Sequence, residues 1–208
     1  MKSKNIVIFG ANGKVGKLLT EYALADGHNV TAFIHRHHDL PDHPRLTIAK
    51  GDIYKQADVR MALKSADVVV SALSSWGTPK KDVLSTAMAN IIPAMQELGI
   101  TRIISLTGAD ARATGDQLSV LHNATHMAIG IIGGKVLQDG EGHIEVLEKS
   151  GLDWTVIRSP VMRSSTNTKY KITMTRPMPW ATVARQAVAR AMIDQAASKD
   201  SLGAVYIK

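Results

Sequence analysis

A short apolar run near the start of the chain ends in three closely spaced glycines. The run is Asn5-Ile6-Val7-Ile8-Phe9, and the glycines fall within Gly10-Ala11-Asn12-Gly13-Lys14-Val15-Gly16. A continuous apolar run of this length is typical of a parallel strand that is covered on both faces. In such a turn Gly10 permits a sharp change of direction, Gly13 lets the backbone approach a pyrophosphate, and Gly16 lets the next helix pack closely on the sheet. The pattern therefore predicts a strand, a turn and a helix that bind a dinucleotide.

Strand and helix patterns alternate along the rest of the chain. Apolar runs bounded by turn residues predict strands, and apolar residues at helical spacing predict helices. The predicted strands are Asn5–Phe9, Asn29–Ile34, Leu46–Lys50, Asp67–Ser71, Ile103–Leu106, Trp154–Arg158, Tyr170–Met174 and Ala204–Ile207. The predicted helices are Lys14–Asp26, part of a helix at Val59–Lys64, Asp82–Leu98, Asp139–Lys149 and Ala181–Ala196. This alternation predicts an α/β fold in a single domain over residues 1–208, a Rossmann-like doubly wound parallel sheet with helices on both faces.

Residues 109–134 interrupt the alternation. The segment is rich in glycine and carries His122, His126 and the apolar run Met127–Ile132. It follows the predicted strand at Ile103–Leu106, and ligands of open α/β sheets bind beyond the carboxyl ends of the strands. We expect a lid or a wall of the substrate pocket here, with a disordered insertion as the alternative.

Composition limits the classes of partner. The formal net charge is +7, but the 25 Lys and Arg residues are scattered and aromatic residues make up only 4% of the chain, so nucleic-acid binding is not expected. No apolar stretch is long enough to suggest a membrane span. The absence of cysteine excludes disulfides and thiolate sites and fits a cytoplasmic protein. His35, His37 and His38 are too close in sequence to face one ion, so no metal site is predicted.

The residues after the second predicted strand indicate which dinucleotide binds. An NAD enzyme typically has Asp or Glu there for the ribose 2′-hydroxyl, whereas an NADP enzyme has a cation for the 2′-phosphate. Here His35-Arg36-His37-His38 follows the strand, and no acid occurs before Asp39. The planar guanidinium of Arg36 suits a phosphate, so NADP(H) is favoured over NAD(H). Lys14 either adds charge to this pocket or is a solvated lysine of the first helical turn.

Other candidate cofactor contacts lie in the glycine turn and after the third predicted strand. The Asp52 carboxylate and the Ile53 amide are placed to bond the adenine amino group and ring nitrogen, although Asp52 on its own is also an ordinary turn residue. The candidate contacts in the turn are Gly10, Asn12, Gly13, Lys14, Val15 and Gly16.

Several motifs resemble the atypical short-chain dehydrogenase/reductase group that includes NmrA-like proteins and biliverdin reductase B, a flavin reductase. Besides the glycine turn and Arg36, they are Gly51-Asp52, Ser71-Ala72-Leu73-Ser74, Ala89-Asn90-Ile91-Ile92 with Ala94-Met95, Ser105-Leu106-Thr107-Gly108 and the run from Glu148 to Pro160. The resemblance covers nearly the whole chain, and the Ser-Gly-Leu-Asp-Trp-Thr run beginning at Ser150 is its most specific mark.

The resemblance implies where the cofactor lies. It implies that Ala72, Leu73 and Ser74 line the phosphate and ribose path. It also implies that Ser105 and Thr107 lie near the nicotinamide ribose, and that Ser159 and Pro160 border the nicotinamide ring.

The Tyr-x-x-x-Lys pair of conventional short-chain dehydrogenases is missing. The four tyrosines are Tyr22, Tyr54, Tyr170 and Tyr206, and none is followed by lysine four positions later. Tyrosine-based alcohol–ketone chemistry is therefore not expected. Hydride transfer to an acceptor that needs little proton help, such as a flavin or a quinone, remains possible.

Candidate catalytic residues are Thr107 and Ser105 as hydrogen-bond donors to the acceptor and His122 as a proton source. His126 in the same segment is a second candidate proton source, and either histidine is otherwise a solvent-facing loop residue. Trp76 and Met162 are candidate contacts for a flat acceptor, or alternatively core residues.

Two of three functions considered fit these features. The preferred one is an NADPH-dependent oxidoreductase that transfers hydride to a flat conjugated small molecule of the flavin or quinone type. The alternative is a non-catalytic NADP(H)-binding sensor of the NmrA type. An epimerase or isomerase needs an acid–base pair that the sequence does not reveal. The expected assembly is a monomer or a homodimer with a small-molecule acceptor.

Overall fold

An open sheet of eight strands forms the centre of this computed structural model, which describes residues 2–117 and 119–208. The strand order is β3-β2-β1-β4-β5-β6-β10-β8, and all neighbours are parallel except β10 and β8. The strands of this sheet are β1 (Asn5–Phe9), β2 (Asn29–Ile34), β3 (Leu46–Lys50), β4 (Val68–Ser71), β5 (Arg102–Gly108), β6 (Asp153–Ser159), β8 (Ile172–Thr173) and β10 (Gly203–Ile207). Two further short strands, β7 (Val161–Arg163) and β9 (Thr182–Ala184), pair with each other.

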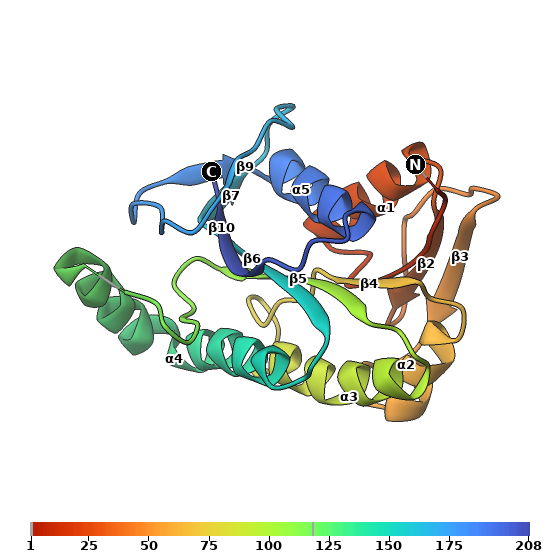
Figure 1. Ribbon diagram of the computed structural model, residues 1–208, viewed down its shortest axis with the longest axis horizontal. Helices are drawn as coiled ribbons and strands as arrows, with labels where there is room; N and C mark the ends of the chain where they lie inside the picture. Colours follow the sequence, from red (N-terminus) through yellow and green to blue (C-terminus); the bar gives the residue numbers. More distant parts are fainter. Residues whose placement is uncertain (1, 118) are drawn as a thin grey trace.

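Helices cover both faces of the sheet (Figure 1). Alternate residues of β1 point to opposite faces, so Ile6 and Ile8 pack in one apolar cluster while Val7 and Phe9 pack in the other. The first cluster includes α1 and α5, and the second includes α2, α3 and the C-terminal part of α4. The helices are α1 (Lys14–Ala25), α2 (Gln56–Leu63), α3 (Val83–Glu97), α4 (Val120–Glu148) and α5 (Arg185–Ala197). The predicted Rossmann-like fold with helices on both faces is confirmed.

The chain reverses its direction across the sheet between β1 and β4. From β1 it runs outward through β2 to β3, and it then returns to β4 on the other side of β1. The loops that follow β1 and β4 therefore diverge at the carboxyl ends of these strands. Such a switch point is where open α/β sheets bind their ligands.

The glycine turn lets α1 lie directly against β1. A Cβ atom on Gly16 would lie 2.0 Å from the Gly10 carbonyl oxygen and 2.7 Å from the Ala11 Cα atom. Gly10 itself has a positive φ of 77°, and a Cβ atom there would lie 2.8 Å from the carbonyl oxygen of Ala72, the residue directly after β4. No side chain fits at either position, so the predicted roles of both glycines in the turn have a direct steric basis.

The start of α3 is capped by a residue from α4. The α3 N-cap residue, Asp82, makes no capping hydrogen bond with its side chain. Instead, the buried Asp139 carboxylate accepts hydrogen bonds from the Leu84 and Ser85 amides, each at 2.9 Å. The hydroxyls of Ser85 and Ser75 donate to the same carboxylate. Asp139 thus fixes the packing of α4 on α3 and satisfies amides that a helix start leaves free.

The helix predicted at Asp139–Lys149 is much longer than expected, because α4 begins at Val120. It absorbs the second half of the segment at 109–134 and changes direction at Gly133, where φ is −134° and ψ is 30°. Residue 118 of that segment lies outside the described residues. Ser119 caps the helix, because its hydroxyl oxygen accepts a hydrogen bond from the His122 amide. A serine at this position is a helix-start signal in the sequence, but the glycine content of the segment favoured a lid or an insertion over a helix.

We call Val120–Ile132 the α4 arm; it extends away from the sheet at the left of Figure 1. Within the described ranges, no helix has the length and apolar character needed to cross a membrane.

Other predicted boundaries also change. The strand predicted at Tyr170–Met174 is reduced to Ile172–Thr173, and it runs antiparallel to β10. The helix predicted from Ala181 begins at Arg185, because Thr182–Ala184 pairs with β7 instead. In both places pairing with a distant segment decides the local structure, and the local pattern contains no information about that partner.

We predict that Gly16→Ala destabilises the fold by several kcal/mol, about the range of severe steric substitutions in a core. Urea denaturation monitored by circular dichroism measures this change. The matched control is Gly142→Ala in α4, where the added Cβ would meet only the Ser85 Cβ at 3.9 Å. This control is expected to leave stability unchanged or to raise it by up to about 1 kcal/mol. Equal stabilities of the two variants would contradict the close packing of α1 on β1.

Candidate functional site

The glycine turn presents the start of α1 to solvent at the switch point. The Gly13 amide donates to the Gly10 carbonyl at 3.0 Å, which closes the turn. Asn12, Gly13 and Lys14 are exposed, and the first turn of α1 contains no acidic residue. Because Gly13 is the N-cap residue, no side chain covers the free amides at the helix start. This arrangement provides an uncompensated positive helix end of the kind that binds phosphate. Val15, also a candidate contact, is buried behind the turn.

The loop after β2 places Arg36 at the carboxyl ends of the strands, as the glycine turn does after β1. His35, Arg36, His37 and His38 are all exposed, and the Asn12 side chain donates to the His37 carbonyl at 3.0 Å. This bond ties the loop to the glycine turn. Within the described residues, the side chains of Arg36 and Lys14 make no hydrogen bond or ion pair.

The first acid after β2 is occupied by a lysine. Asp39 Oδ2 lies 2.6 Å from Lys17 Nζ on α1, and this hydrogen bond lowers the pKa of Asp39. The Asp39 carboxylate therefore pairs with a lysine of α1. The side chains of Arg36 and Lys14, the two cations nearest the turn, are left free to bind an anionic ligand. The electrostatic balance at this end of the site is positive.

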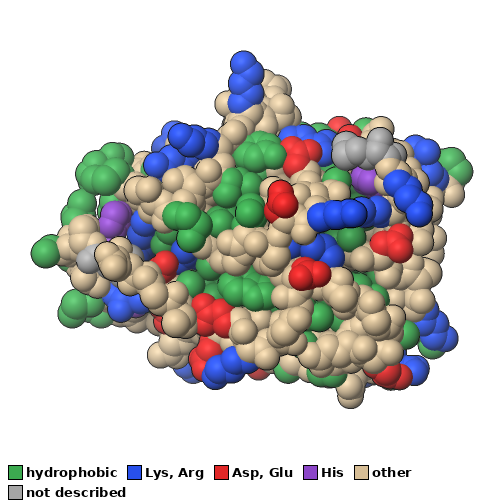
Figure 2. All heavy atoms as spheres, viewed as in Figure 1, with side chains coloured by type: hydrophobic (Ala, Val, Ile, Leu, Met, Phe, Trp, Pro, Cys, Tyr) green, Lys and Arg blue, Asp and Glu red, His purple; other side chains and the backbone are tan. Residues whose placement is uncertain are grey.

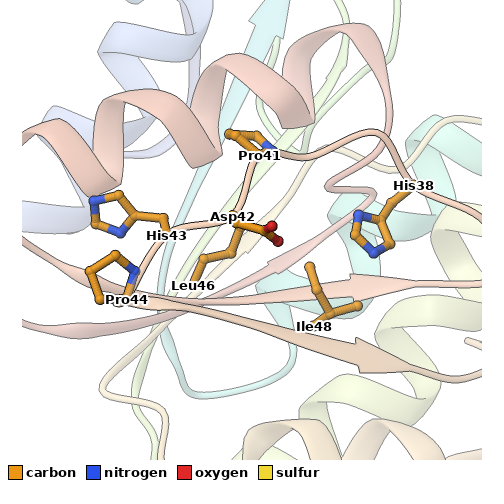
Figure 3. Close-up of a pocket in the computed structure, with 7 residues that line it drawn as sticks. All are labelled: His38, Pro41, Asp42, His43, Pro44, Leu46 and Ile48. Carbon is orange, nitrogen blue, oxygen red and sulfur yellow. The ribbon is translucent and has the colours of Figure 1, made fainter.

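A pocket of about 350 Å³ adjoins the Arg36 loop (Figure 3). Leu46 and Ile48 of β3 form its apolar floor, and the loop from His38 to Pro44 crosses above them. His38 and His43 lie at opposite ends of the pocket in this view. The remaining lining residues are Pro41, Asp42 and Pro44.

The loop after β3 is held in a defined conformation. The Asp52 Oδ1 atom accepts from the Tyr54 amide at 3.0 Å, and the Ile53 carbonyl accepts from the Asn90 side chain at 2.7 Å. The second Asp52 carboxylate oxygen and the Ile53 amide make no hydrogen bond within the described residues. The two groups predicted to contact adenine are thus left free, and their role stays a prediction.

The part of the site that is distant from Arg36 lies at the carboxyl ends of β4, β5 and β6. Strand register places Ser71 of β4 opposite Ser105 of β5, and Thr107 opposite Arg158 of β6. Beyond β4, Ala72 and Leu73 are partly buried and Ser74 is exposed. Ser159 ends β6, and its hydroxyl donates to the Pro160 carbonyl at 2.9 Å. The residues that the family resemblance assigns to the ribose and the nicotinamide therefore lie on adjacent strand ends.

The two candidate hydroxyls on β5 differ in environment. Ser105 is fully buried, and its Oγ atom lies 2.8 Å from the Nε2 atom of the equally buried His143 on α4. Thr107 is only partly buried, and its hydroxyl makes no hydrogen bond among the described residues. Thr107 is therefore the hydroxyl that can bind a ligand directly.

Both candidate histidines of the α4 arm already have protein partners. The His122 ring lies 3.0 Å from Ser119 Oγ and 3.2 Å from the Pro177 carbonyl oxygen. The His126 ring lies 3.1 Å from the Asp110 carbonyl oxygen and 3.6 Å from a carboxylate oxygen of Glu141. These contacts attach the arm to the body of the protein. Neither histidine is brought to Thr107 by a contact, and their proposed catalytic roles stay predictions.

The loop from residue 109 to 117 is anchored by two buried arginines. Arg158 of β6 forms an ion pair with Asp116 and stacks on the Tyr206 ring, with its guanidinium carbon 3.9 Å from the ring centroid. Arg176 pairs with Asp110. A guanidinium buried with a carboxylate partner holds its geometry firmly. This loop, the first half of the predicted lid, is thus fixed to β6 and to the segment before β9.

An exposed apolar surface lies along the N-terminal part of α4 and at Trp76. Trp76, beyond β4, is 65% exposed, and a Cβ atom on Gly133 at the α4 kink would lie 3.2 Å from its ring. The α4 arm carries exposed Val120, Leu121, Met127, Ile131 and Ile132, and Figure 2 shows apolar side chains gathered at this end of the molecule. Met162 on β7 is partly buried against the core. Over the same face, Lys and Arg are dispersed among acidic side chains rather than collected into one stripe (Figure 2).

Three residues that shape the site escaped sequence analysis: Asp139, His143 and Arg158. Asp139 and His143 are four positions apart on α4, and both are buried beside Ile144 and Leu147. Two polar residues at helical spacing on an otherwise apolar face were a usable signal of a buried polar network.

Comparison with known proteins identifies the family. A family model described as NAD(P)H-binding matches residues 10–199, which is most of the chain. The chain belongs to this NAD(P)H-binding family. Among curated proteins, a probable pinoresinol-lariciresinol reductase 3 from Arabidopsis thaliana is 31% identical over 80 residues. That match covers 36% of this chain and only 26% of the relative, so it spans about a quarter of the relative's length.

Solved structures with the same fold match nearly the whole chain. A short-chain dehydrogenase/reductase from Veillonella parvula in complex with NADP is 22% identical, with a TM-score of 0.79 over 99% of this chain and 94% of that one. An anaerobilin reductase, ChuY, from Escherichia coli O157:H7 is 22% identical, with a TM-score of 0.76 over 98% of this chain and 96% of that one. Membership of the NAD(P)H-binding family confirms the predicted nicotinamide cofactor, and the solved structures confirm the predicted resemblance as a likeness of fold.

We predict that the protein loses stability in mild acid because of its buried histidines. Burial lowers the pKa of His143 to about 4 and also lowers the pKa of His28. Because unfolding restores an ordinary pKa near 6.5, this stability is present above about pH 6.5 and is lost as the pH falls toward about 4. His143 alone should account for about 2 kcal/mol between pH 7.5 and 5, measured by urea denaturation at each pH. His143→Gln should show a shallower pH dependence, and an unchanged slope in this variant would refute the assignment.

Proposed function

We propose that this protein is an NADPH-dependent oxidoreductase that transfers hydride to a flat conjugated small molecule of the flavin or quinone type. The carrying observation is that the glycine turn and one free hydroxyl, Thr107, both lie at the carboxyl ends of the strands. The helix that packs on Thr107, α4, also carries the exposed apolar side chains of its arm. When bound, NADPH supplies the hydride, and the protein supplies binding and orientation.

The charges around the adenosine end support NADP(H) over NAD(H). Arg36 and Lys14 are exposed next to the glycine turn, and each lacks a partner among the described residues. Asp39, the first acid that follows β2, is paired with Lys17. A 2′-phosphate in this position meets two unpaired cations, whereas the first carboxylate that follows β2, that of Asp39, is held by Lys17 and is not free to bind a 2′-hydroxyl. The Veillonella parvula neighbour with bound NADP has the same fold.

The packing of α4 on β5 fits the absence of the Tyr-x-x-x-Lys pair. Gly140 faces Thr107, and a Cβ atom on it would lie 2.7 Å from Thr107 Oγ1. At this turn, therefore, the helix presents no side chain to Thr107. Acceptors that take up hydride and are protonated separately from solvent, as flavins and quinones are, suit such a site.

The substrate is proposed to lie against the α4 arm. Trp76 offers a large exposed ring, and Ile131 and Ile132 are 86% and 85% exposed. Exposed apolar area of this kind is typical of ligand or partner contacts. We propose that residues 109–134 form the pocket wall, with Met162 on the opposite side and His122 and His126 as further candidates for contact with the acceptor. The buried Ser105 would act from behind Thr107. Two relatives, from Arabidopsis thaliana and Escherichia coli, are named reductases.

A second candidate is an NADP(H)-binding sensor without turnover. Ser105 and His143 are bonded to each other in the core, and His122 and His126 are bonded to the protein. Thr107 thus has no free acid or base in contact with it among the described residues, which favours this alternative. Turnover assays distinguish the two functions.

The cofactor proposal predicts that Arg36→Ala weakens NADPH binding by about tenfold to a hundredfold and NADH binding by less than about threefold. The reason is that the guanidinium contacts only the 2′-phosphate. Calorimetric titration with each dinucleotide measures both affinities. Arg60→Ala is the matched control, because this exposed arginine pairs with Glu97 on the far end of α3. Equal weakening of NADPH and NADH by Arg36→Ala would exclude the proposed role.

The reductase proposal predicts that purified protein consumes NADPH when FMN or a soluble quinone is added. Trp76→Ala should raise the KM for the acceptor by about tenfold and change the KM for NADPH little, because the lost ring contact involves the acceptor alone. Met61→Ala, which removes a similarly exposed side chain from α2, is the control. Tight NADPH binding without consumption across a broad acceptor panel would favour the sensor instead.

A further inference from the structure

A serine–histidine pair lies in the core directly behind the proposed nicotinamide position. Ser105 on β5 and His143 on α4 are both 0% exposed, and Ser105 Oγ lies 2.8 Å from His143 Nε2. The other ring nitrogen, Nδ1, lies 3.2 Å from the Gly140 carbonyl oxygen one turn earlier in α4.

These two contacts determine where the protons are. A carbonyl oxygen can only accept, so Nδ1 of His143 carries the ring proton and donates it to Gly140. In the neutral ring Nε2 is then an acceptor, and the Ser105 hydroxyl donates to it. Burial lowers the pKa of His143 to about 4, although Asp139 acts in the opposite direction, so the ring stays neutral near pH 7.

The pair is therefore closed to proton transfer with solvent. The Ser105 hydroxyl donates its hydrogen bond to His143, and His143 donates its own to a carbonyl, which has no proton to donate further. Ser105 is left with acceptor capacity only, and Thr107 remains as the hydroxyl that can donate to a ligand.

The same histidine also holds the part of α4 that faces Thr107. Gly140 approaches so closely that a Cβ atom on it would lie 2.7 Å from Thr107 Oγ1 and 3.2 Å from the Ala111 Cβ. A shift of this helical turn therefore moves Thr107. His143 is bonded to Gly140 and to Ser105, two residues before Thr107 on the same strand face.

We propose that His143 is a positioning residue for the nicotinamide end of the cofactor, where it fixes the Ser105 hydroxyl and the Gly140 turn behind Thr107. The inference rests on the proposed function only in placing the nicotinamide beside Thr107. An apolar side chain of similar size would fill the same space but would leave Ser105 without an acceptor. The Ser71 hydroxyl, opposite Ser105 in the strand register, makes no hydrogen bond to it.

The test compares two ligands that differ at the nicotinamide end. NADPH carries the nicotinamide, whereas 2′,5′-ADP carries only the adenosine and its phosphates. His143→Leu should weaken NADPH binding by about tenfold, which corresponds to the net loss of one or two hydrogen bonds, and change 2′,5′-ADP binding by less than about twofold. His143→Gln keeps an acceptor within reach of Ser105 and should stay within about threefold of the original protein for NADPH.

The matched control is His28→Leu, because His28 is also a buried histidine with a lowered pKa. It bonds to the Lys4 amide at 3.2 Å, before β1, and so lies at the opposite end of the strands from Thr107. This variant should lower the stability of the fold and leave both affinities unchanged. Equal weakening of both ligands by His143→Leu, or no weakening of NADPH, would show that His143 is only a core residue.

A spectroscopic measurement covers the case in which His143→Leu does not fold. In the original protein, ¹⁵N NMR of the His143 ring should show the neutral tautomer protonated at Nδ1 from pH 5.5 to 8. Titration of this ring near pH 6.5, or a proton on Nε2, would overturn the proposal. Failure of every acceptor to consume NADPH would refute the reductase function alone, since neither the binding comparison nor the NMR measurement requires turnover.

Discussion

The contact between α1 and β1 at the glycine turn is the constraint on which the candidate site at the carboxyl ends of the strands depends. With the Gly16 Cα this close to the Gly10 carbonyl, α1 starts directly at the end of β1, and its free amides point beyond the sheet. The same turn is held against β4 through Gly10 and Ala72. Hence one backbone packing arrangement positions the candidate phosphate site and the glycine turn, to which the Asn12 side chain bonds the Arg36 loop.

The opposite wall of the site depends on polar groups buried in α4. Asp139 replaces the missing side-chain cap of α3, and His143 bonds Ser105 on β5. A buried polar group without a partner is costly, so each of these side chains specifies one packing position for α4 rather than a range of them. Gly140 between them removes the side chain that would otherwise stand opposite Thr107. The wall is therefore closely packed where it meets β5, whereas the arm beyond Gly133 exposes apolar side chains.

Most of the central fold could be predicted, because its strands carry their own signal. Asn5-Ile6-Val7-Ile8-Phe9 is apolar on both faces, and the structure buries alternate residues in two separate clusters. The α4 arm could not be predicted in the same way. The glycines of residues 109–134 suggested a lid or an insertion, while the helix of the arm is supported by the Ser119 cap and by bonds from His122 and His126 to distant carbonyls. Likewise, β9 exists because β7 lies beside it.

The sequence by itself determined the glycine turn, the cation after β2 and the absence of a Tyr-x-x-x-Lys pair, because each of these depends on residue types at fixed short spacings. Membership of the NAD(P)H-binding family agrees with the presence of the glycine turn. Only the tertiary structure decided which of the two β5 hydroxyls is free, since Ser105 and Thr107 occur in the same motif and lie on the same strand face. The difference between them arises from His143, which lies 38 positions away in sequence from Ser105 and reaches it only when α4 packs on β5.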